Sequence, residues 1–99
     1  MVLKIPVDAA GMQRAADEHG DLMRSIAQRG KEAGAAHHNF FEGDDGQVIV
    51  VDEWDSPDNF KAFFEAEGEN IGQLMQTAGA QGEPDPPRFY RALSLGDEF

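Results

Sequence analysis

Apolar and polar residues alternate at the start of the chain. In the segment VLKIPV, Leu3, Ile5 and Val7 fall on one side and Lys4 on the other. This two-residue period is typical of a strand with one buried face. Asp8 follows directly, and its short carboxylate suits the N-cap of a helix. The pattern therefore predicts a first strand over residues 2–7 and a helix that begins after it.

The next segment has the spacing of one face of a long helix. Apolar side chains and one histidine recur at steps of three and four residues, at Met12, Ala15, Ala16, His19, Leu22, Met23, Ile26 and Ala27. This spacing indicates an amphipathic helix. The pattern fades near Gly30, and we expect the helix to end by Gly34, since a residue without Cβ can adopt the left-handed conformation that closes helices.

A β-hairpin is predicted next, because two β-rich runs flank the turn-forming tetrapeptide GDDG at residues 43–46. Ser56 and Pro57 are typical of an N-cap and a first helical position. The helix that they begin is expected to be interrupted at Gly68 and to stop at Gly79. After a loop, the alternation in RFYRALSL predicts a last strand over residues 88–95.

The order is therefore strand, helix, strand, strand, interrupted helix, strand, within one domain of residues 1–99. This order is typical of the α+β class and of the ferredoxin-like βαββαβ arrangement, a four-stranded antiparallel sheet with helices on one face. The run VIVV at residues 48–51 places apolar side chains on both faces of its strand. Two helices cover only one face, so we expect a second copy of the chain to cover the other in a homodimer.

Composition narrows the function classes. The chain has 99 residues, a net charge of −11 and no clustered Lys or Arg, which is the wrong sign for binding nucleic acid or an anionic membrane. No stretch approaches the length of a membrane span. The chain contains no cysteine, which excludes disulfides and thiolate chemistry and fits a reducing compartment. We expect a cytoplasmic protein.

The segment VVDEWDS, followed directly by SPDNFKAFFEA, resembles a strand, tryptophan and helix motif of the dimeric α/β-barrel proteins of the antibiotic-biosynthesis-monooxygenase type. The order of elements and the long first helix agree with this resemblance over almost the whole chain. It implies a homodimer with a small-molecule pocket in each protomer. Some members of this group are oxygenases that use neither metal nor flavin and act on aromatic substrates, and others degrade haem.

Candidate site residues follow from these patterns. His19, His38 and Trp54 are the candidate catalytic residues, and Phe40, Asp52, Phe64 and Tyr90 are the candidate ligand-binding residues. His19 is either a partly buried structural histidine or part of a pocket, and Trp54 is either a large core residue or the roof of a pocket. Asp52 shares the strand face of Trp54, where a carboxylate could border a dry pocket.

The two adjacent histidines constrain metal chemistry. His37 and His38 point to opposite faces of a strand, so they cannot both ligate one metal, and the sequence leaves open which of them faces a pocket. No metal site and no cofactor are expected. Residues 61–75 contain no histidine, whereas the haem-degrading members carry one on the helix after the tryptophan strand. This difference argues against haem degradation.

Two functions remain open. The first is a cofactor-independent monooxygenase that acts on an aromatic small molecule. The alternative is a non-catalytic homodimer that binds a small hydrophobic ligand or serves as a scaffold.

Overall fold

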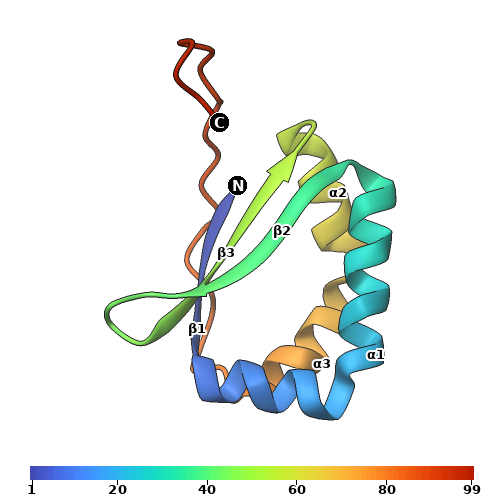
Figure 1. Ribbon diagram of the computed structural model, residues 1–99. Helices are drawn as coiled ribbons and strands as arrows, with labels where there is room; N and C mark the ends of the chain where they lie inside the picture. Colours follow the sequence, from blue (N-terminus) through green and yellow to red (C-terminus); the bar gives the residue numbers. More distant parts are fainter.

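The computed structural model describes residues 1–99 and contains a sheet of three antiparallel strands (Figure 1). β1 spans Val2–Asp8, β2 spans Ala35–Glu42 and β3 spans Gln47–Trp54, and the order in the sheet is β1-β3-β2. Residues opposite one another on neighbouring strands share a face of the sheet. Leu3, Val50 and Phe40 therefore form a row on the inner face, toward the helices.

α1 spans Ala9–Ala33 and has the expected ends. The Asp8 carboxylate accepts a hydrogen bond of 2.7 Å from the backbone N–H of Gly11, which confirms the predicted N-cap. Gly34 closes the helix with a φ angle of 126°, a conformation that strongly favours glycine.

α2 spans Pro57–Ala66 and α3 spans Gly68–Ala78. The Ser56 hydroxyl accepts a hydrogen bond of 3.1 Å from the N–H of Asn59, so this predicted cap is also present. Gly79 ends α3 in the left-handed region. None of the three helices combines the length and the apolar character that a membrane span needs.

A sharp bend divides α1, and the periodicity of the sequence did not predict it. His19 has φ and ψ angles of −130° and 36°, which are not helical, and Gly20 follows it. Figure 1 shows the two halves of α1 running in different directions. Arg14, in the first half of α1, and His19, at the bend, both form hydrogen bonds with Thr77 of α3. Arg29, in the second half, contacts Glu67 at the α2–α3 junction.

The core lies between the inner face of the sheet and the helices. The alternation predicted for β1 is confirmed, because Leu3, Ile5 and Val7 are all buried. The main apolar cluster consists of Leu3, Ile5, Val7, Met12, Ala15, Val48, Val50 and Ala78. β1, β3 and the first half of α1 supply most of it, and α3 adds Ala78.

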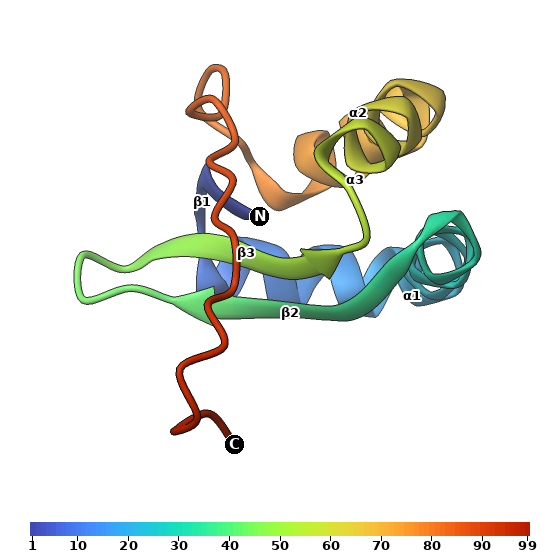
Figure 2. The same cartoon turned by 90° about the horizontal axis from the view of Figure 1, so that it is seen from above.

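The predicted fourth strand over residues 88–95 is not formed in the structure. Residues 81–88 run beside β1, where the N–H groups of Gln81, Asp85 and Arg88 donate to carbonyls of β1, and Arg88 forms an isolated bridge with Val2. The following residues extend beyond the end of β1 and away from the body of the molecule (Figures 1 and 2). Alternation alone cannot make a strand, because each strand also needs a partner backbone.

Candidate functional site

A cavity of about 520 Å³ lies between the inner face of the sheet and the three helices. Of the 27 residues that line it, 18 are hydrophobic. This volume lies in the range of small-molecule sites, which are mostly apolar and carry a few placed polar groups. The cavity can therefore enclose a compact organic molecule with a large apolar surface.

Aromatic side chains form the wall of the cavity next to α2. The ring centroid of Trp54 lies 5.6 Å from that of Phe60 and 5.3 Å from that of Phe63. Phe64 extends the cluster, with its centroid 5.6 Å from Phe60. These separations and tilted arrangements are favourable for aromatic pairs. Trp54 is partly buried, packs against the aromatic cluster and also lines the cavity.

A polar group interrupts this apolar lining where β2 and β3 pair. Nδ1 of His38 lies 2.7 Å from Oδ1 of Asp52, and Nε1 of Trp54 donates to Oδ2 of the same carboxylate over 3.0 Å. The side chain of Asp52 is only 8% exposed, whereas that of His38 is 40% exposed. All three residues line the cavity, so a ligand there meets an imidazole beside an aromatic wall.

The structure decides which of the two adjacent histidines faces the cavity. His38 lies on the inner face of the sheet and lines the cavity. His37 is exposed on the opposite face, where its Nε2 lies 3.5 Å from Oε2 of Glu53. The two side chains point to opposite faces, as the strand geometry predicts.

The other candidate residues are divided between the cavity and the rest of the molecule. Phe40 and Phe64 line the cavity together with His38, Asp52 and Trp54.

Two candidates lie elsewhere. His19 is not among the lining residues, and its Nε2 lies 3.1 Å from the hydroxyl of Thr77 at the bend of α1. Tyr90 is 68% exposed in the extended C-terminal segment and does not line the cavity either. The sequence places both on apolar faces, but it does not show that the helix bends at His19 or that the chain leaves the sheet before Tyr90.

Several cavity residues were not identified as ligand contacts from the sequence. Phe60 and Phe63 lie on the same apolar face of the helix as Phe64. This shared periodicity is the sequence feature that could have identified them as cavity residues. Met23 and Met75 come from α1 and α3, which are far apart along the chain. No local pattern could have shown that these two helices border the same cavity.

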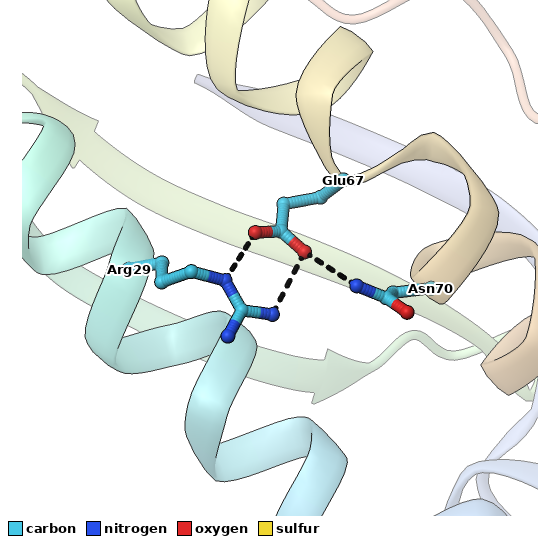
Figure 3. Close-up of polar contacts among 3 residues, drawn as sticks. All are labelled: Arg29, Glu67 and Asn70. Carbon is cyan, nitrogen blue, oxygen red and sulfur yellow. Dashed lines mark hydrogen bonds and ion pairs between the residues drawn. The ribbon is translucent and has the colours of Figure 1, made fainter.

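An ion pair between a half-exposed arginine and a buried glutamate joins α1 to the junction between α2 and α3 (Figure 3). The guanidinium of Arg29 donates to both carboxylate oxygens of Glu67, and the amide nitrogen of Asn70 donates to Oε2 of Glu67 over 3.0 Å. Glu67 is almost fully buried. The hydrogen bond from Arg29, followed by that from Asn70, lowers the pKa of Glu67 to about 2 from its ordinary value of 4.5. This pair holds the helices that form one side of the cavity.

We expect Glu67→Gln to lower the free energy of unfolding by about 1 to 3 kcal/mol near neutral pH. The substitution removes a buried carboxylate that accepts hydrogen bonds from the charged guanidinium of Arg29. Half-exposure of Arg29 favours the lower part of that range. The pKa of Glu67 is lower in the folded state, so its contribution is complete above 4.5 and is lost as the pH falls toward about 2.

Urea unfolding, followed by the fluorescence of Trp54, measures this effect. The difference between wild type and Glu67→Gln should shrink progressively below pH 4.5. Glu65→Gln, at an exposed position of α2, is the matched control and should change stability by less than about 0.5 kcal/mol. A difference between wild type and Glu67→Gln that does not depend on pH would contradict the role of the ion pair.

The residues do not form a metal centre of a common type, because no group of three or more His, Cys, Asp or Glu side chains is arranged to hold a metal ion. The polar side chains that line the cavity include the imidazole of His38, the indole N–H of Trp54 and the carboxylates of Asp52 and Glu83. Of these, His38, Asp52 and Trp54 are joined by hydrogen bonds.

The fold and the cavity together define an α+β protein of the ferredoxin-like kind with a small-molecule-sized site between sheet and helices. The structure is similar to the crystal structure of a monooxygenase from the gene ActVA-Orf6 of Streptomyces coelicolor, in complex with the ligand nanaomycin D. The TM-score is 0.59 at 21% sequence identity, over 94% of this chain and 89% of that chain.

At that identity the similarity shows the fold alone, and in fold it confirms the resemblance to proteins of the antibiotic-biosynthesis-monooxygenase type. Comparison with models of known families gives no match, and comparison with curated proteins finds none similar in sequence.

Proposed function

We propose that this protein is a homodimeric monooxygenase-like enzyme that oxidises an aromatic small molecule in its cavity, with no metal or flavin. The cavity of about 520 Å³, with its aromatic wall and single imidazole, carries this proposal. The similarity in fold to a monooxygenase with a bound ligand supports it. A flat aromatic molecule stacks against Trp54 and Phe64, and its polar substituent meets His38.

The reaction uses dioxygen as the oxidant. For an anthrone-type substrate, the ring methylene becomes a carbonyl: one oxygen atom enters the product, and the other leaves as water with the two methylene hydrogens. No external reductant is needed, because the substrate supplies all the electrons. His38 accepts a proton from the substrate, and Trp54, Phe40 and Phe64 orient the ring. His19 lies outside the cavity and supports the site through the bend of α1.

Oxygen uptake with a panel of anthrones and hydroquinones tests the proposal. We expect uptake with at least one compound, and Trp54→Phe and His38→Ala should each reduce it by about 10- to 1000-fold. His37→Ala is the matched control, because His37 lies on the opposite face of the same strand. Binding measured by quenching of the single tryptophan, without any oxygen uptake, would contradict the enzyme and favour the non-catalytic ligand-binding protein.

The homodimer uses the outer face of the sheet. Lys4, Ile49 and Phe41 form a row on that face, where Ile49 is only half-buried and Phe41 is 51% exposed. Leaving such apolar area in water costs free energy in a small domain, and burial against a second copy recovers it.

The C-terminal segment belongs to the same proposal. Its exposed apolar side chains Tyr90, Leu93 and Leu95 become buried against the second copy of the chain. Residues 88–95 then form the fourth strand. On that strand, Tyr90 lies close enough to the second copy to contact either the bound ligand or the dimer interface.

A further inference from the structure

The carboxylate of Asp52 forms hydrogen bonds with two neighbouring side chains. Oδ1 lies 2.7 Å from Nδ1 of His38, and Oδ2 accepts from the indole N–H of Trp54 over 3.0 Å. With its side chain 8% exposed, Asp52 has little surface left for a ligand. The structure therefore argues against direct ligand binding by Asp52 and indicates that it acts on its neighbours.

This arrangement determines the tautomer of His38. An ionised carboxylate only accepts hydrogen bonds, so the hydrogen of the neutral imidazole resides on Nδ1, and Nε2 carries the free lone pair. The ring of Phe40 packs edge-on against the imidazole, with the centroids 5.0 Å apart. Asp52 and Phe40 thus hold the ring from two sides, with 40% of the His38 side chain still exposed.

We infer that His38 Nε2 is the proton acceptor for an aromatic ligand with an acidic hydroxyl, and that Asp52 is the residue that positions His38. The ligand class comprises phenols, hydroquinones and the enol forms of anthrones. This inference rests on the proposed function and specifies the polar end of the ligand. The indole N–H of Trp54 completes the array, because it holds the second oxygen of Asp52.

The proton transfer is simple to balance. The O–H bond of the ligand breaks, its electron pair stays on oxygen, and the proton forms a new bond to Nε2. The products are a phenolate and an imidazolium, and the nearby carboxylate of Asp52 stabilises the imidazolium charge. In a mostly apolar cavity, a ligand hydroxyl placed beside the aromatic wall without such an acceptor would lose its hydrogen bond to water with no replacement there.

A binding experiment that does not require turnover tests the ligand class. We expect the wild-type protein to bind 2-naphthol at least about tenfold more tightly than 2-methoxynaphthalene, as measured by quenching of Trp54 fluorescence. His38→Ala should remove this preference, so that the two probes bind with affinities within about twofold of each other, whereas His37→Ala should keep the preference. Equal affinity of wild type for the two probes, or a preference that survives in His38→Ala, would overturn the inference.

Nitrogen-15 NMR of the histidine rings tests the positioning role. In the ligand-free protein we expect His38 to show a protonated Nδ1 and an unprotonated Nε2 in its neutral form. Asp52→Asn offers an amide donor to Nδ1, so it should shift the hydrogen to Nε2, and Asp52→Glu should restore the original pattern. An unchanged pattern in folded Asp52→Asn would refute the role of Asp52. These readouts need no oxygen uptake, so they separate failure of this inference from failure of the proposed enzyme.

Discussion

Gly11→Ala is expected to destabilise the protein by about 2 to 3 kcal/mol, although alanine is the better helix former. A Cβ atom at Gly11 would lie 2.1 Å from the backbone oxygen of Ala78, so α1 and α3 would have to separate. Both helices also border the cavity. For a domain of this size, the loss corresponds to a fall in melting temperature of roughly 10 to 20 °C.

Gly72→Ala is the matched control for this substitution. Gly72 lies within α3, and a Cβ atom there meets nothing within 4 Å. The same chemical change should therefore stabilise the protein by about 0.5 to 1 kcal/mol, because it lowers the entropy of the unfolded chain. Thermal unfolding followed by circular dichroism measures both variants. Similar melting temperatures for Gly11→Ala and wild type would show that the two helices do not need this close contact.

Phe41→Glu is expected to convert the proposed dimer into monomers without unfolding the chain. Phe41 is 51% exposed on the outer face of the sheet, so the substitution creates no cavity within the protomer. In a two-fold symmetric interface the substitution is present twice, once in each copy of the chain. A loss of only about 1.4 kcal/mol at each copy raises the dissociation constant about 100-fold, and each copy already carries a net charge of −11.

Light scattering coupled to gel filtration at micromolar concentration measures this change. Gln73→Glu adds the same charge at an exposed position of α3 and should leave the mass unchanged. A monomeric wild-type protein would rule out the dimer at that concentration. A Phe41→Glu variant that stays dimeric would show that the outer face of the sheet is not the interface.

Local features were predictable from the sequence because they depend on residues close together in the chain. The caps formed by Asp8 and Ser56 and the left-handed glycines at Gly34 and Gly79 all occur where the sequence places them. The alternation of β1 also correctly predicts its buried face. The last strand shows the limit of this reasoning, because the alternation of residues 88–95 provides no partner backbone.

The candidate site was predictable only in part. Strand parity placed Asp52 and Trp54 on one face, and both line the cavity. The same reasoning could not choose between His37 and His38, because parity gives opposite faces without saying which face carries the helices. His19 shared the periodicity of cavity-lining residues such as Met12 and Met23, but the bend directs it to Thr77 instead.

The sequence by itself determined the order of the elements as far as α3, most of their ends and the buried face of β1, since these depend on side-chain spacing and on caps within a few residues. Only the tertiary structure decided that α1 bends, that Arg29 pairs with Glu67, and that His38, Asp52 and Trp54 meet beside a cavity. The physical reason is that each of these features depends on where backbone segments cross in space, and one-dimensional spacing does not contain that information.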